Sequence, residues 1–318
     1  MSQRLRAELA LAFCTFLWGS TFVVVKNALD QSSVFVFLAV RFSLAGLCMA
    51  LFRPRVLRTL QREEIFAGIR LGFFMFGGYA FQTAGLKYTT ASNSGFITGS
   101  SVVLVPLILA LFWGKRVTGW VYFGTVAAAG GLYFLTVPVS GMAHLNHGDV
   151  LTFFAAASYA VHIILVSEYA REHSAAALSV LQVIACAGMA WLTALGAHSI
   201  RWQTMRFEPS GTLWVGVSVC AVFATAVAFS LQLWAQQYTT PSHAAILFTL
   251  EPVFAVATSY MLLGERLGAR SLVGAALVLA GILAAELLGQ VVVVVPAHVI
   301  ELDETDSALG QPSGQQAV

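Results

Sequence analysis

Residues 88–92 of this 318-residue chain read Tyr-Thr-Thr-Ala-Ser, and residues 238–242 read Tyr-Thr-Thr-Pro-Ser. The same offset of 150 positions pairs further identical residues around these segments. The pairs are Gln82 with Gln232, Val103 with Val253, Gly114 with Gly264, Arg116 with Arg266, Gly124 with Gly274, and Gly131 with Gly281. A register that holds over about fifty residues indicates a duplicated structural unit rather than a chance match.

The composition places this duplicated unit in a lipid bilayer. Apolar residues make up 58% of the chain and charged residues only 10%, against roughly 45–50% and 25% in soluble domains. The mean hydropathy is +0.80. Several apolar runs reach the roughly 17–25 residues that a helix needs to cross the hydrocarbon core. The ten runs are residues 9–25, 34–52, 65–84, 94–113, 120–139, 150–167, 175–197, 213–235, 244–263 and 271–288.

These runs predict an all-α integral membrane protein with ten transmembrane helices. The runs are continuously apolar, whereas the strands of membrane barrels alternate over about ten residues. Each copy of the unit contributes five helices, an odd number, so the two copies are expected to thread the membrane in opposite directions as inverted five-helix repeats. We place the first repeat at 7–139 and the second at 149–289. Residues 290–318 contain a short valine run, expected as a frayed helix end or a sticky segment, and an acidic, Gln-rich stretch that predicts a disordered cytoplasmic tail.

The distribution of Lys and Arg predicts the orientation. Basic residues lie before the first run, after the second and after the fourth, at Arg4, Arg6, Arg53, Arg55, Arg58, Arg62, Lys115 and Arg116. All of these positions share one predicted face, which the positive-inside rule assigns to the cytoplasm. The second half carries a weaker bias of the opposite sense, at Arg201, Arg206, Arg266 and Arg270. We expect a multi-pass protein of the cell (inner or plasma) membrane with both termini in the cytoplasm.

Polar residues at mid-membrane depth are the candidate substrate-binding groups. Inverted repeats are the architecture in which many secondary transporters alternate access to a site near the bilayer midplane, and charges at that depth are costly. Arg41 is expected to attract an anionic group of the substrate, and Glu251 to neutralise a cationic group or exchange a proton. The two side chains are also candidates to pair with each other. The alternative for both is a salt bridge that only fixes helix packing.

Further candidates lie in or beside the first, third, fourth, sixth, eighth and ninth runs. Gln82 and Gln232 are repeat mates, as are Asn93 and His243. Thr98 belongs to a row of hydroxyls with Ser94 and Ser101, and His162 is a titratable group in the sixth run. Trp18, Tyr79 and Trp234 are candidates for an aromatic wall. Ordinary helix packing is the alternative for each of these residues.

Two prolines predict kinks in equivalent helices of the two halves. Pro106 lies in the fourth run and Pro252 in the ninth. Each removes one backbone donor, which leaves a carbonyl of the preceding turn without its usual partner. Broken helices in corresponding places of two repeats point to a transporter site, although prolines are also common in plain membrane helices.

Several of these segments together resemble the EamA family of the drug/metabolite transporter superfamily. They are residues 17–20 (Leu-Trp-Gly-Ser), 41–42 (Arg-Phe), 87–92 (Lys-Tyr-Thr-Thr-Ala-Ser), 250–252 (Leu-Glu-Pro) and 264–266 (Gly-Glu-Arg). The resemblance covers about residues 7–289. It implies a ten-helix permease with a central cavity formed by helices one to four and six to nine, and with helices five and ten at the periphery. Known members mostly export amino acids and related metabolites or move other small organic solutes.

The chain departs from that family's pattern at one loop position. Lys115 is the repeat mate of Glu265, so the first repeat lacks the Gly-Glu-Arg motif. This departure argues against a transport role for the Glu265 carboxylate.

We therefore expect a permease, an exporter, that moves small organic metabolites such as amino acids by alternating access, with proton coupling left open. The alternative is a membrane receptor or scaffold that does not transport. No Walker loop or dinucleotide fingerprint occurs in a suitable context, and we expect neither an enzyme nor a cofactor nor a nucleic-acid partner. A loop cluster gives only a weak signal for a metal, and none is expected; its residues are His144, Asn146, His147 and Asp149.

The fifth and tenth runs carry small residues at matching positions. These are Gly124, Ala128 and Gly131 in the fifth run, and Gly274, Val278 and Gly281 in the tenth. Small faces of this kind let helices approach closely. They are expected to pack either within the bundle or between the protomers of a homodimer.

Overall fold

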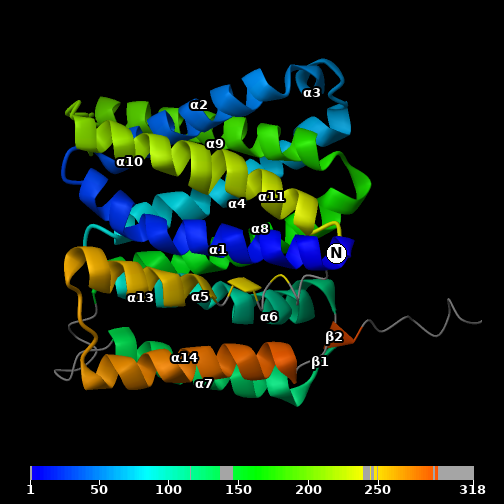
Figure 1. Cartoon of the computed structure of the whole chain (residues 1–318), viewed down its shortest axis with the longest axis vertical. Coiled ribbons are helices and arrows are strands. Elements are labelled where there is room, and N and C mark those ends of the chain that lie inside the picture. Colours follow the sequence, from blue (N-terminus) through cyan, green and yellow to red (C-terminus); the bar gives the residue numbers. More distant parts are fainter. Residues whose placement is uncertain are drawn as a thin grey trace, which may run out of the picture.

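The computed structural model describes residues 2–114, 116–136, 146–238, 244, 247–248, 250–288 and 291–292, which form a helical bundle (Figure 1). The first half contains α1 (Gln3–Ala28), α2 (Val34–Phe52), α3 (Pro54–Arg58), α4 (Arg62–Gly85), α5 (Ala91–Gly99), α6 (Ser101–Trp113) and α7 (Gly119–Thr136). The second half contains α8 (His147–Glu172), α9 (Ala175–Ser199), α10 (Gly211–Ala221), the π-helical η2 (Val222–Val227), α11 (Ala228–Ala235), α13 (Leu250–Leu263) and α14 (Ala269–Leu287). The predicted all-helical fold is confirmed.

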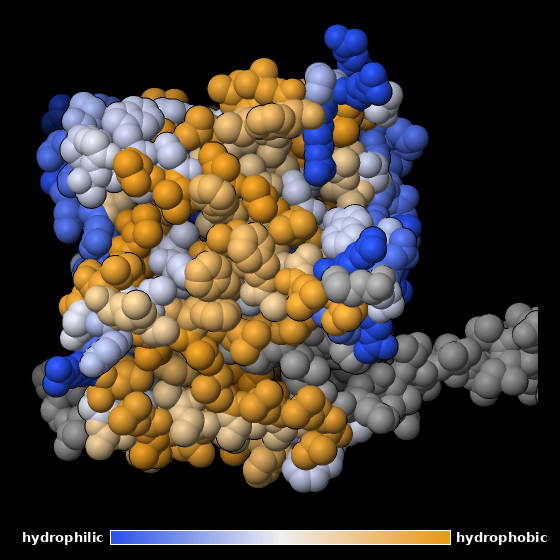
Figure 2. All heavy atoms as spheres, viewed as in Figure 1, coloured by the Kyte–Doolittle hydropathy of each residue, from blue (hydrophilic) through white to orange (hydrophobic). Residues whose placement is uncertain are grey.

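The length and surface of these helices fit a bilayer. Six helical stretches within the described residues are long and apolar enough to cross a membrane: α1, α2, α5 with α6, α8, α9, and α10 through α11. The helix α13 and the Ala269–Ala284 part of α14 are shorter apolar helices. The face drawn in Figure 2 is apolar across the middle of the helices and polar toward both of their ends. The chain is thus built as a multi-pass membrane protein, and the count of ten spans stays a prediction.

Equivalent helices of the two halves run in opposite directions. Thr89 links the end of α1 to the start of α8, because Lys26 Nζ donates to the Thr89 carbonyl at 2.9 Å and the Thr89 hydroxyl donates to Asp149. In the same way α2 starts where α9 has ended, and Ser33 N donates to the Arg206 carbonyl at 2.9 Å. We call this side of the molecule the Lys26 end. The opposite side, where α1 and α4 begin, is the Arg62 end.

The break in the fourth predicted span lies at Ser100 rather than at Pro106. The backbone N–H and the hydroxyl of Ser100 both donate to the Ile97 carbonyl, at 3.1 and 2.6 Å, which tightens the chain into a turn between α5 and α6. Pro106 lies inside α6, and Pro252 lies in the first described turn of α13. The eighth predicted span contains a second irregularity, η2, which its continuous apolar sequence does not signal.

The peripheral helices α7 and α14 pack on each other through their small faces, beside the rest of the bundle (Figure 1). A Cβ atom added at Gly131 would lie 2.6 Å from the Gly274 carbonyl oxygen, and one at Gly281 would lie 2.6 Å from the Gly124 carbonyl oxygen. Only glycine permits backbones to approach this closely. The small faces are therefore occupied within one chain, and a homodimer stays a prediction that needs another surface.

Two details at the helix ends complete the fold. Gly114 and Gly264, which are repeat mates, follow α6 and α13 with φ of 63° and 64°, a left-handed conformation that favours glycine. The strand β1 (Arg116–Val117) pairs antiparallel with β2 (Val291–Val292). The first residues of the valine run therefore form a short strand instead of a frayed helix end. The rest of the predicted tail lies outside the described residues.

Candidate functional site

A cavity of about 70 Å³ lies among helices of both halves. Its wall comes from α1, α2, α4, α5 and α6 of the first half, and from α8, α11, Phe248 and α13 of the second. Eight of the predicted binding residues line it: Trp18, Arg41, Tyr79, Gln82, Thr98, His162, Gln232 and Glu251. A cavity of this size, lined by apolar and polar side chains together, holds several water molecules or part of a small solute.

Arg41 is the buried cation of the cavity. Its side chain is 1% exposed, Nε donates to the Thr225 hydroxyl at 3.0 Å, and Nη2 donates to the Tyr79 hydroxyl at 3.4 Å. The guanidinium carbon also lies 4.7 Å from the centroid of the Tyr79 ring, within range of a cation–π interaction. These partners hold the guanidinium in place while leaving it a net positive charge.

The π-helical turn η2 creates the partner of Arg41. The Thr225 hydroxyl donates to the carbonyl of Cys220, five residues earlier, at 2.8 Å. The hydroxyl hydrogen is thus used within the turn, so an oxygen lone pair is left to accept from Arg41. Such π-helical turns occur often at functional sites. Sequence reasoning missed Thr225 because nothing in an apolar run distinguishes a π turn from an α-helix.

Gln82 is fully engaged in the cavity wall. Its Nε2 donates to the Thr98 hydroxyl at 3.0 Å, and its Oε1 accepts from the Tyr159 hydroxyl at 3.2 Å. The Tyr159 ring packs edge-on against Tyr79, with centroids 5.6 Å apart. A Cβ atom at Gly78 would lie 2.3 Å from the Tyr159 ring, so this ring is seated on a glycine of α4. Tyr159 also lines the cavity and was not among the predicted residues.

The cavity wall of the second half carries one buried acceptor without a hydrogen bond and one carboxylate. The Gln232 Oε1 atom is buried without a hydrogen-bond partner among the described residues, and the half-buried Glu251 carboxylate lines the same cavity. A buried acceptor without a donor is costly. Gln232 Oε1 is therefore available to a ligand that brings N–H or O–H donors.

The predicted pairing of Arg41 with Glu251 is wrong for this structure. Both residues line the cavity, but Arg41 uses its described donors on Thr225 and Tyr79. The reason is local, because the π turn and α4 bring hydroxyls closer to the guanidinium than α13 brings its carboxylate. The two charges remain separate groups in one cavity.

Aromatic side chains and His162 complete the wall. Trp18 Nε1 donates to the Ala224 carbonyl of η2 at 3.0 Å, and the Trp18 ring lies 5.4 Å from Phe229 and 5.6 Å from Phe248 between centroids. The Nε2 atom of His162 lies 2.9 Å from Gln182 Oε1. These contacts fix Trp18 and His162 as walls of the cavity.

The remaining predicted residues do not join this cavity in the described part of the chain. Asn93 lies in the first turn of α5, where its backbone N–H is capped by the Thr90 hydroxyl at 3.0 Å. Trp234 packs on Tyr238, with ring centroids 5.4 Å apart. His243 and Lys115 lie outside the described residues. The binding role of every predicted residue stays a prediction.

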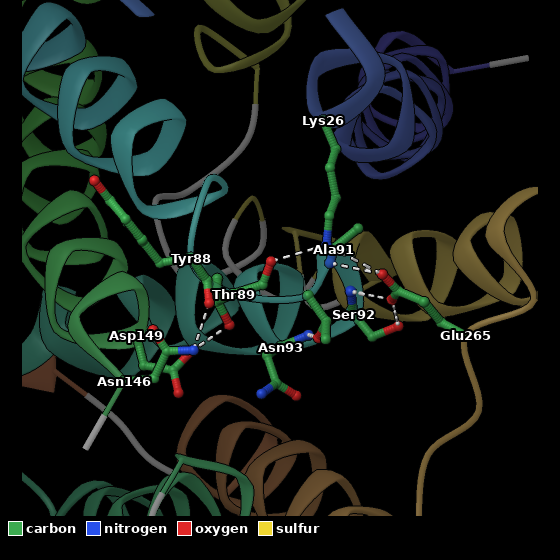
Figure 3. Close-up of polar contacts among 10 residues, drawn as sticks. Lys26, Tyr88, Thr89, Ala91, Ser92, Asn93, Asn146, Asp149 and Glu265 are labelled. Carbon is green, nitrogen blue, oxygen red and sulfur yellow. Dashed lines mark hydrogen bonds and ion pairs between the residues drawn. The ribbon is translucent and has the colours of Figure 1, made fainter. Parts of the chain in front are cut away.

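A polar network lies at the Lys26 end of the molecule (Figure 3). The Glu265 carboxylate follows α13 and accepts hydrogen bonds from α5, and Lys26 Nζ lies 3.5 Å from its Oε1. Burial alone would raise the pKa of Glu265, but hydrogen bonds from Ser92 and Ala91 and the charge of Lys26 outweigh it and lower the pKa. Beside it, Asn146 Nδ2 donates to the Tyr88 carbonyl. Within the described residues, no group of three or more metal-ligating side chains was found.

Comparison with known proteins identifies the architecture. The EamA-like transporter family matches twice, at residues 5–137 and 146–286. The chain belongs to the EamA-like transporter family. An uncharacterized transporter of Archaeoglobus fulgidus is 38% identical over 281 residues, which cover 88% of this chain and 86% of the relative. The recognised family and its two-repeat architecture are confirmed.

More distant relatives include an exporter whose name states its substrates. The threonine/homoserine exporter RhtA of Salmonella typhimurium is 29% identical over 235 residues, which cover 72% of this chain and 74% of that protein. A solved structure, 19% identical, superposes with a TM-score of 0.64 over 89% of this chain and 97% of the other. That likeness concerns the fold alone. The chain is a transporter of the EamA type.

Proposed function

We propose that this chain is a secondary permease that exports small organic metabolites, amino acids among them, by alternating access between its two halves. The observation that carries the proposal is the cavity itself. It lies between helices that run in opposite directions, and it combines a buried guanidinium, a carboxylate and aromatic walls. A zwitterionic solute of modest size complements such a set, because Arg41 attracts its anionic group and Glu251 and Gln232 accept from its cationic group.

The setting proposed for this activity is the cell membrane. Ten spans arranged as inverted repeats, with both termini in the cytoplasm, agree with the excess of basic residues at the Arg62 end, where Arg4, Arg53 and Arg62 lie. Threonine and homoserine are the first solutes to test, because the relative RhtA is named as their exporter. Glu251 is the group proposed to exchange a proton if a pH gradient drives the flux. No catalytic reaction is proposed.

Solute flux into reconstituted vesicles tests the proposal. Arg41→Ala and Glu251→Gln are expected to reduce flux by about 30- to 150-fold, since each removes a charged contact of roughly 2–3 kcal/mol to the solute. The control is Glu8→Gln, which breaks only the exposed Arg4–Glu8 pair and leaves flux unchanged. The second candidate, a receptor or scaffold, predicts solute binding without net movement. Unaltered flux in both cavity variants would remove these residues from the site.

A further inference from the structure

The Glu265 carboxylate accepts hydrogen bonds from the first turn of α5. Its Oε1 accepts from Ala91 N at 3.3 Å, and its Oε2 accepts from Ser92 N at 3.2 Å and from the Ser92 hydroxyl at 2.8 Å (Figure 3). The backbone N–H groups at a helix N-terminus are unpaired and carry partial positive charge, which favours an anion there. Glu265 therefore acts as a cap of α5 that comes from the other half of the chain.

Lys26 ties the same carboxylate to a third helix. Its Nζ atom lies 3.5 Å from Glu265 Oε1 and donates to the Thr89 carbonyl at 2.9 Å. Thr89 in turn donates to Asp149 at the start of α8. In Figure 3 these side chains converge from separate helices on the short segment that precedes α5. The network thus joins α1, α5, α8 and the loop after α13 at one point.

This network lies next to the cavity. Val25 and Leu86 line the cavity, and they directly precede Lys26 and Lys87 in the chain. At the other end of α5, Gly99 also lines the cavity and meets Pro252 of α13, where an added Cβ would lie 3.0 Å from the proline ring. Because α5 belongs to the first half and Glu265 to the second, this contact joins the two halves beside the cavity.

The equivalent contact at the Arg62 end, between Lys115 of the first half and Pro241 of the second, lacks the chemistry that the Glu265 contact uses. The offset of 150 that pairs the two copies places Lys115 at the position of Glu265 and Pro241 at the position of Ala91. A lysine ammonium donates but does not accept, and proline has no backbone N–H to offer. This argument rests on the sequence alone, because both residues lie outside the described part of the chain. The sequence thus provides the acceptor and the backbone donor for this contact at the Lys26 end and not at the equivalent positions of the Arg62 end.

We propose that Glu265 is a latch that holds the Lys26 end closed, that each transport cycle releases it, and that the lack of an equivalent latch at the Arg62 end biases the resting molecule toward opening there. The inference rests on the proposed transport function and differs from the expectation, drawn from the sequence, that this carboxylate has no transport role. It assigns Glu265 a gating role at the mouth of the cavity without contact to the solute.

Thiol labelling of the cavity tests the latch without any solute. In a chain whose four cysteines are replaced, Val25→Cys places a reporter in the cavity wall beside the latch. A charged, membrane-impermeant thiol reagent is applied to sealed vesicles of either orientation. The Glu265→Gln variant is expected to raise the labelling rate from the Lys26 side about tenfold, which corresponds to roughly 1.4 kcal/mol in the gate equilibrium, the size of one charge-assisted hydrogen bond.

A matched control lies at the same end of the molecule. Glu208 forms an exposed ion pair with Arg206 at 3.8 Å, and Glu208→Gln is expected to leave the labelling rate unchanged. Ser92→Ala removes one of the latch contacts and is expected to raise the rate by about threefold. If Glu265→Gln does not elute from size exclusion as the wild type does, the labelling rate of Ser92→Ala tests the proposal in its place.

Two results would overturn the proposal. The latch is contradicted if labelling from the Lys26 side stays at the wild-type rate in both Glu265→Gln and Ser92→Ala, whatever the flux measurements show. An equal increase in Glu208→Gln assigns the effect to lost surface charge. Absent flux in the wild-type chain, combined with faster labelling in Glu265→Gln, would instead contradict the transport function while supporting the latch.

Discussion

Repeat mates have matching surroundings in the α7–α14 pair and different surroundings at the cavity. At the periphery, Gly131 and Gly281 each meet a backbone carbonyl of the partner helix at the same 2.6 Å from an added Cβ. At the cavity, Gln82 uses both amide atoms in hydrogen bonds, whereas Gln232 Oε1 is buried without a partner in the described part of the chain. The two copies thus share the packing that holds helices together and differ in the groups that face a solute.

Substitution of the peripheral glycines tests the shared packing and has the largest expected effect. Gly131→Val and Gly281→Val each push a side chain into a backbone contact of 2.6 Å, and overpacking that the backbone cannot relieve costs about 3 kcal/mol or more. We expect both variants to lose thermal stability in detergent to a similar extent. The control is Gly130→Ala, because no described atom lies within 4 Å of an added Cβ there. A large loss of thermal stability in only one of the two variants would contradict the matching surroundings of Gly131 and Gly281.

The two glutamines test the difference at the cavity. Gln82→Ala removes the hydrogen bonds to Thr98 and Tyr159, which we expect to cost about 1–3 kcal/mol of stability. Gln232→Ala removes an acceptor that has no partner among the residues that the structure describes, so stability is expected to stay within about 0.5 kcal/mol. The measurement is the melting temperature with and without solute. Stabilisation by solute should shrink in Gln232→Ala, and an equal loss of stability in both variants would contradict the assigned difference.

Acidification tests the latch and has the smallest expected effect. The pKa of Glu265 is lowered, so its contribution is fully present above the ordinary glutamate pKa and is lost only as the pH falls through the lowered value. Between about pH 8 and pH 6, labelling of the Val25→Cys reporter from the Lys26 side is therefore expected to change by less than about twofold. The rates are normalised to an exposed cysteine in Glu208→Cys, since thiol reactivity itself depends on pH.

Other charged groups of the network define what a different result would mean. Lys26 faces the Glu265 carboxylate, and Asp149 accepts from Thr89 on the other side of the network. Faster labelling near pH 6 that disappears in Glu265→Gln would show that the carboxylate titrates far above its expected range. Faster labelling that persists in Glu265→Gln would assign the pH dependence to another group, Asp149 first.

Part of the candidate site was visible in the sequence for a simple physical reason. A charge or an amide inside an apolar run is costly in lipid, so Arg41, Glu251, Gln82 and Gln232 stood out as residues that need an interior environment. Tyr159 did not stand out, because a tyrosine in an apolar run suits lipid, packing and a cavity equally well. Its place became clear only from its hydrogen bond to Gln82 and its contact with Gly78.

The sequence by itself determined the helical membrane fold, the duplication and its family, because apolar runs of bilayer length and a repeated register leave little freedom for another architecture. Only the tertiary structure decided how polar groups are partnered. Arg41 bonds to the π turn at Thr225 instead of to Glu251, and Glu265 caps a helix that begins 174 positions earlier in the chain, at Ala91. Partners so distant are set by the packing of helices against one another, which no local pattern encodes.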